Sequence, residues 1–242
     1  MRTWANRFAL LAVATVLAGL GACSGSDSSK EPTPPPAVTT VLASGVITGL
    51  GSVYVNGARY DTDAAAVTMD DQPAAPLQLK VGQYVELKGH EHADGSNAAD
   101  VIRYHNVLEG PISSIDATAG TLVAIGQTVR ITLDTVFGDS IEPAALEGLA
   151  LNDVIEVSGI VPTDGVVLAT RVDMKPDGGP YDVSGYVTSV SVAEHRFSIN
   201  ALVVDYIALG PKIEAELRGK FEDAGHEIRI IGFAKQISDI AE

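Results

Sequence analysis

The chain has 242 residues, of which 31 are acidic and 16 are basic, so its formal net charge at pH 7 is −15. This balance argues against a nucleic-acid partner, because affinity for phosphate backbones depends on clustered lysine and arginine side chains. The single cysteine, Cys23, excludes an intrachain disulfide.

The amino terminus has the composition of a secretory signal. Arg2 and Arg7 supply positive charge, and residues 8–18 are apolar apart from Thr15. The apolar stretch is too short to span a membrane, which takes about 20 apolar residues. The pattern predicts that residues 1–22 are a signal peptide that is removed.

The motif LGAC, which ends at Cys23, resembles the lipobox of bacterial lipoproteins. The resemblance implies that the Cys23 thiol is alkylated by a diacylglycerol and that the new amino terminus is acylated. Three acyl chains exceed the two signals that stable anchoring needs. Ser24 resembles the sorting residue of outer-membrane lipoproteins, which implies a cell-envelope location at the outer membrane, facing the periplasm or the cell surface. The alternative is an ordinary signal peptide that ends near a lone cysteine.

Residues 23–42 follow as a tether. The stretch SGSDSSKEPTPPP is rich in serine and proline and contains almost nothing to bury. It predicts a disordered, solvated segment with a stiff polyproline end, whose role is reach.

Three segments of the remaining chain share a pattern, which indicates an internal repeat. They read YVELKGHEHADG from Tyr84, VIEVSGIVPTDG from Val154 and EAELRGKFEDAG from Glu214. In each, a glycine is followed six residues later by a second one. Upstream of each lies a strand, turn and strand that open on Gly45, Gly110 and Gly185.

The local pattern is that of β-hairpins. Apolar and polar residues alternate, so that Val85 and Leu87 would face one side of a strand and Glu86 the other. Asp-Gly pairs at Gly95 and Gly165 favour hairpin turns. In the connection of the second repeat, SIEPAALEGLAL, Ser140 could cap one or two helical turns, whereas DDQPAAPLQL in the first repeat predicts a loop.

Taken together, these features resemble a small β-barrel domain repeated in proteobacterial lipoproteins, the domain of unknown function DUF5666, which is related in shape to the OB fold. The resemblance implies a mainly β protein with three tandem OB-like barrels, and it supplies no catalytic residues. The third repeat departs most, with Ala224 at the turn aspartate. The expected domains are residues 43–106, 107–175 and 181–238, with a linker at 176–180.

The linkers predict an uneven arrangement. Residues 104–107 join the first two repeats closely, whereas proline and glycine separate the second from the third. We expect the first two repeats to pack together and the third to be more mobile.

Two histidines are the best candidates for a metal site. His90 and His92 would share one face of a continuing strand, and Asp94, Asp100 or His105 could complete a site for Zn²⁺ or Cu²⁺. The other repeats lack this pair, so a solvated loop is the alternative.

A glutamate recurs in the same strand position of all three repeats, as Glu86, Glu156 and Glu216. Their outward phase predicts a wet strand face, where a carboxylate serves solubility or a cross-strand pair. We therefore assign them no catalytic role.

No phosphate-binding loop, G-x-S-x-G or H-E-x-x-H motif occurs, and we predict no catalytic residues. The expected function is a non-enzymatic binding or structural module, held at a membrane by its lipid and engaging an envelope protein or polymer. The alternative is a lipoprotein that binds a small ligand or a divalent metal, through the His90 and His92 hairpin or a barrel mouth. No other cofactor is expected.

Overall fold

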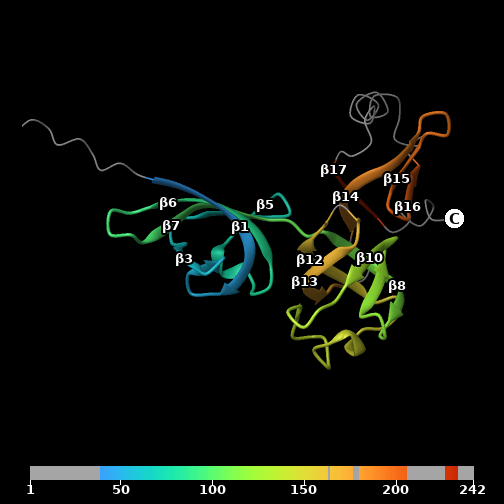
Figure 1. The fold of residues 1–242 in the computed structure, drawn as a ribbon, viewed down its shortest axis with the longest axis horizontal. Coiled ribbons are helices and arrows are strands. Elements are labelled where there is room, and N and C mark those ends of the chain that lie inside the picture. The colour runs from blue at the N-terminus through green and yellow to red at the C-terminus, as the bar shows by residue number, and fades with distance from the viewer. Residues whose placement is uncertain (1–38, 163, 177–179, 206–226, 234–242) are drawn as a thin grey trace, which may run out of the picture. The chain divides into compact units, whose positions relative to one another are not determined.

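The computed structural model describes residues 39–205, except 163 and 177–179, and residues 227–233 (Figure 1). These residues form seventeen β-strands and two short 3₁₀ turns. No helix in this part of the chain is long and apolar enough to cross a membrane. The predicted signal peptide and Cys23 lie outside the described residues.

Five strands close the first barrel. They are β1 (Thr39–Gly49), β2 (Val53–Val55), β3 (Ala58–Asp61), β6 (Tyr84–Glu91) and β7 (Asn97–Tyr104). The ring runs β1-β2-β3-β7-β6 and returns to β1. Its one parallel pair, β3 with β7, completes the closure of the five-stranded ring.

The second barrel repeats this ring. Its strands are β8 (Leu108–Asp116), β9 (Thr121–Ala124), β10 (Gln127–Arg130), β12 (Val154–Ile160) and β13 (Val167–Met174). They follow the order β8-β9-β10-β13-β12, again with one parallel pair, β10 with β13. Both are five-stranded barrels of the OB type, so the predicted mainly β fold of tandem small barrels is confirmed.

The final hairpin of each barrel forms where the Asp-Gly pairs predicted it. Strands β6 and β7 pair antiparallel around Gly95, and β12 and β13 pair around Gly165. Both glycines have a positive φ, 83° and 76°, which costs glycine little. The Asp94 carboxylate accepts hydrogen bonds from the Ser96 backbone and hydroxyl, and these lower the pKa of Asp94.

In each of the first two repeats, the first of the two glycines that are six residues apart lies at a β-bulge. The β6–β7 register shifts between Lys88 and Gly89, and the β12–β13 register shifts between Ser158 and Gly159. A Cβ on Gly89 would overlap the carbonyl oxygen of Ala98. Glycine recurs here because the partner strand's backbone approaches too closely for any side chain.

A second bulge recurs in all three repeats, three residues after the opening glycine. A serine or threonine hydroxyl there donates to a carbonyl of the second strand: Thr48 to Tyr54 at 3.4 Å, Ser113 to Val123 at 3.1 Å and Thr188 to Ser198 at 3.2 Å. The register shifts at the same place in each repeat. The three repeats therefore share local geometry as well as sequence.

The connections between third and fourth barrel strands differ from what we predicted. In the first repeat the expected loop is a hairpin, β4 (Ala66–Met69) and β5 (Gln72–Ala74), followed by η1 (Pro76–Gln78). Its turn residues Asp70 and Asp71 take positive φ angles, which aspartate tolerates. In the second repeat, β11 (Val136–Phe137) precedes a single 3₁₀ turn, η2 (Leu146–Gly148), whose N-cap position is Ala145 rather than Ser140 and has no side-chain cap.

The third repeat begins like the other two. Strands β14 (Pro180–Ser191), β15 (Arg196–Ile199) and β16 (Leu202–Asp205) form a meander, and β17 (Glu227–Phe233) pairs with β14. Residues 206–226, which contain the predicted third hairpin and Glu216, lie outside the described residues. Closure of a third barrel therefore stays a prediction.

The hydrophobic cores show that the third repeat packs on the second. The first barrel has its own core, whereas Val183, Phe197 and Ile199 of the third repeat belong to the core of the second barrel. Strand β14 also pairs with β8. The proline and glycine spacer therefore does not keep these two repeats apart, because a buried apolar face stabilises their contact. The greater mobility of the third repeat stays a prediction.

Candidate functional site

A buried polar cluster joins the first barrel to the second. The Tyr104 hydroxyl at the end of β7 donates to Glu156 Oε1 of β12 at 2.7 Å. The other carboxylate oxygen, Oε2, accepts from Lys175 Nζ at 2.7 Å, and Lys175 also lies 3.2 Å from Glu109. Tyr104 is 1% exposed and Glu156 9%, so these bonds are shielded from water. We call this contact the junction.

Three carboxylates form a row, and Lys175 contacts two of them, Glu156 and Glu109. Glu156 of β12 pairs directly with Glu109 of β8, and Glu109 pairs with Asp182 of β14. Residues directly opposite in a sheet project to the same face, so the row crosses three adjacent strands. Like charges opposite one another repel, and the Lys175 ammonium offsets that repulsion.

The pKa values reflect this crowding. Burial, aided by the nearby Glu156 charge, raises the pKa of Tyr104 well above its usual value. Burial also raises the pKa of Glu109, against the opposing effect of Lys175. For Lys175, burial alone would lower the pKa, but hydrogen bonds and attraction to Glu156 and Glu109 outweigh it and raise the pKa. At neutral pH Tyr104 is thus a neutral donor and Lys175 is charged.

A second set of contacts flanks the cluster. Arg171 of β13 donates to the Val81 carbonyl at 2.9 Å and forms a two-bond ion pair with Asp173. Asp173 also accepts from Lys80 of the first barrel at 3.1 Å. Burial would raise the pKa of Asp173, but the two cations outweigh it and lower the pKa. The backbone N–H of Tyr84 donates to the Ser158 hydroxyl at 2.8 Å.

A groove opens beside the junction. A hollow of about 360 Å³ is lined by residues of both barrels and of β14, among them Tyr84, Arg103, His105, Ile160 and Val161. A neighbouring hollow of about 320 Å³ shares Glu86 and Arg103 with it and continues along the first barrel past Leu42 and Lys88. We call the two together the groove. The groove is open and is lined by both polar and apolar side chains, which suits an extended chain.

The predicted metal ligands are brought together only in part. His90 Nδ1 lies 2.8 Å from Asp100 Oδ1, and the His90 and His92 rings meet edge to face at 4.8 Å between centroids. Asp94 bonds within its own turn, and His105 lines the groove. Across the described ranges, no three His, Cys, Asp or Glu side chains are grouped so as to hold a metal ion. Metal binding stays a prediction.

The outward phase of the recurring glutamate is confirmed for Glu86, which is exposed. For Glu156 the predicted wet face is wrong. Its strand does turn the carboxylate outward from the second barrel, but Tyr104 of the first barrel covers that face. The carboxylate is therefore buried by a neighbouring repeat.

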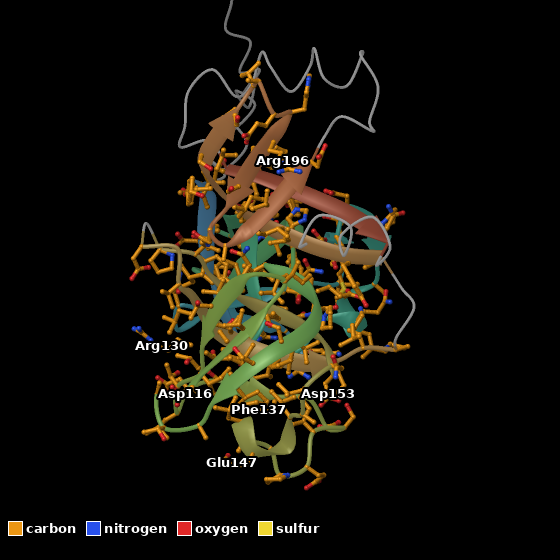
Figure 2. The ribbon with its side chains drawn as sticks, turned by 90° about the vertical axis from the view of Figure 1, so that its right-hand side faces the viewer. Asp116, Arg130, Phe137, Glu147, Asp153 and Arg196 are labelled. Atoms are coloured by element: carbon orange, nitrogen blue, oxygen red, sulfur yellow. The ribbon has the colours of Figure 1, made fainter. Side chains whose placement is uncertain are left out.

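The end of the second barrel offers a further hollow, of about 400 Å³, lined by Ile131, Phe137 and Leu146. Figure 2 shows Phe137 at this end of the barrel, with Glu147 on the connection that follows it. Among the residues that line this hollow Glu147 alone carries a charge, whereas several charged side chains line the groove, so we give the groove preference as a binding surface.

The roles of Tyr104, Lys175 and Arg103 were not predicted from the sequence. One signal was available, because the strand VIEVSG carries apolar residues on both sides of Glu156. A strand that is apolar on both faces is buried on both faces. This pattern would have marked Glu156 as a buried carboxylate in need of a partner.

Alkaline pH should loosen the junction. Tyr104 and Lys175 both have raised pKa values, so the stability they contribute is fully present below their unfolded values, near pH 10 and 10.5, and is lost as pH rises through the folded ones. Tyr104→Phe should lower the free energy of unfolding by about 1–2 kcal/mol at neutral pH, because Glu156 loses a buried donor. The variant should also lose less stability than the unchanged protein between neutral and alkaline pH. Thermal unfolding from neutral to alkaline pH measures both. Tyr54→Phe, on an exposed ring, is the control, and equal behaviour of the two variants would contradict the assignment.

Comparison with known protein families gives one result. The family model described as a domain of unknown function, DUF5666, matches residues 44–103 and again residues 109–173. The matches coincide with the two closed barrels and together cover half of the chain. No curated protein and no solved structure showed a significant match.

Proposed function

The chain belongs to the DUF5666 family, and we propose that it is a non-enzymatic binding module of the bacterial cell envelope, anchored by a lipid on Cys23. The lipobox-like motif and the signal-like residues before it support the anchor. The proline-rich tether supports a role in which the barrels reach a partner at some distance from the membrane.

The groove carries the binding part of the proposal. The closed ring pairs most of its own backbone edges, so recognition within the groove falls to side chains and loops. The groove combines the Tyr84 ring with apolar Ile160 and Val161 and with the Arg103 charge. Aromatic and arginine side chains are enriched in the centres of protein interfaces. We propose an envelope protein as the partner.

The test compares two charge reversals in the full-length chain. Arg103→Glu changes the groove, whereas Arg130→Glu changes an exposed arginine on β10 of the second barrel, labelled in Figure 2. Partner recovery by cross-linking in intact membranes should fall about tenfold for Arg103→Glu and stay unchanged for Arg130→Glu. If both variants recovered the partner equally, the groove would not be the binding surface. If a soluble Cys23→Ser variant still bound the partner fully, the function would not depend on the lipid anchor.

A further inference from the structure

Strand β1 is longer than its barrel needs. It pairs with β6 from Thr39 to Val46, but with β2 only at Ile47 and Gly49. On the β2 side, Asn56 Nδ2 donates to the Ser44 carbonyl at 2.9 Å and ends the barrel's contact with β1. Among the described residues, no strand pairs with the stretch 39–43 on that side. We call this stretch the β1 edge.

The bond from Asn56 shows which way the backbone of the β1 edge points. Since the Ser44 carbonyl points away from β6, Ser44 and Glu86 form a non-hydrogen-bonded pair of the antiparallel ladder. Backbone groups of a strand point the same way at every second residue, so the direction found at Ser44 recurs two and four residues earlier. The N–H and C=O groups of Leu42 and Thr40 therefore also point away from β6.

The edge lacks the usual protection. Natural sheets guard an exposed edge with proline, charged side chains or a bulge. The sequence TTVLA at the β1 edge has none of these, and the Leu42 side chain is 76% exposed. Strand β5, which is the last strand in the order of this sheet, does carry a proline, Pro73. An unguarded edge beside a groove indicates that another strand covers it in use.

The surroundings favour an acidic partner segment. Leu42 lies directly opposite Lys88, and Arg103 lines the same part of the groove, so two of its three charged side chains are cationic in a protein of net charge −15. The opposite face of the edge, with Val41 and Ala43, packs against the first core. An added strand would thus alternate apolar residues on that face with a carboxylate on the groove face.

We infer that the β1 edge binds an extended acidic segment of a partner protein by strand addition. The segment adds main-chain hydrogen bonds to Thr40 and Leu42, as in other complexes built by β-augmentation. Its carboxylate pairs with Lys88 or Arg103. This inference rests on the proposed function and specifies how the partner is held.

The experiment uses the full-length chain in detergent and two synthetic peptides of about nine residues. Both alternate Val and Thr, and one carries a central Glu where the other carries Lys. The Glu peptide should slow amide hydrogen exchange at Thr40 and Leu42 about tenfold, and the Lys peptide should do so less. Leu42→Pro removes one outward N–H and should abolish the protection, whereas Leu42→Ala keeps the N–H and should retain it. Lys88→Glu should reverse the preference between the peptides.

Other results would overturn the inference in distinguishable ways. Protection in the chain alone that grows with concentration would show a second copy at the edge. Protection that is independent of concentration would show another part of the same chain there. If neither peptide protects the edge at millimolar concentration, strand addition is wrong. The groove assignment would still stand or fall by the Arg103→Glu comparison, because that test uses the membrane partner itself.

Discussion

Lys175→Met should destabilise the protein by about 3 kcal/mol at neutral pH. The substitution keeps a side chain of similar length but removes the Lys175 cation that holds Glu156 and Glu109. Three carboxylates would then share one partly buried face, with Asp182 as the third. Removing one partner of a shielded ion pair is costly because the remaining charges stay desolvated. The shift of the urea midpoint at constant slope measures the loss.

The stability lost in Lys175→Met should be smaller in mildly acidic buffer than at neutral pH. Glu109 already has a raised pKa, so the stability linked to its protonation is fully present below its unfolded pKa, near 4.5, and is lost as pH rises through the folded pKa. Without Lys175 that pKa should rise further, so mildly acidic buffer should restore part of the stability. Lys80→Met is the control, since Lys80 is 50% exposed and Asp173 keeps Arg171, and it should cost less than about 1 kcal/mol. Equal losses for the two variants, or a Lys175→Met loss unchanged by acid, would contradict the role of Lys175.

Gly159→Ala should destabilise the second barrel by on the order of 3 kcal/mol. The added Cβ would overlap the carbonyl oxygen of Leu168 on the partner strand, at the bulge where the register of β12 and β13 shifts. Strand β13 cannot retreat without breaking its ladder to β10, which pairs with it at Leu168. Gly89→Ala should do the same in the first barrel, where the added Cβ meets Ala98.

Urea unfolding followed by circular dichroism measures this second effect. The control is Ile160→Ala, which truncates a neighbouring side chain that is 41% exposed and should change stability by less than about 1 kcal/mol. A Gly159→Ala variant as stable as Ile160→Ala would mean that the bulge relaxes easily. The recurring glycine would then need an explanation other than close backbone approach.

Much of each barrel could be predicted because its signals are local. The alternation around Leu87 identifies a strand, and Asp-Gly at Gly95 identifies the turn that returns it. The connections were harder, since the stretch around Pro73 was expected to be a loop and is a hairpin with proline on its edge strand. Proline forbids a ladder bond only where its missing N–H would face a partner, and sequence does not show which side that is.

The candidate site was less predictable because it depends on contacts between repeats. Glu86 and Glu156 occupy the same position in equivalent strands and have the same outward phase, yet one is exposed and the other is buried against Tyr104. Similarly, nothing local marks Lys175, which lies at the end of one barrel and holds carboxylates of two strands.

The sequence by itself determined the repeat, the strand alternation and the hairpin turns, because each depends on φ and ψ preferences or on spacing within a few residues. Only the tertiary structure decided that the third repeat shares the core of the second, that Glu156 is a buried junction residue, and that no described strand pairs with residues 39–43 of β1 on the β2 side. The physical reason is that burial and pairing are properties of surfaces brought together from distant parts of the chain. Repeats of closely similar sequence can therefore expose a residue in one copy and bury the equivalent residue in another.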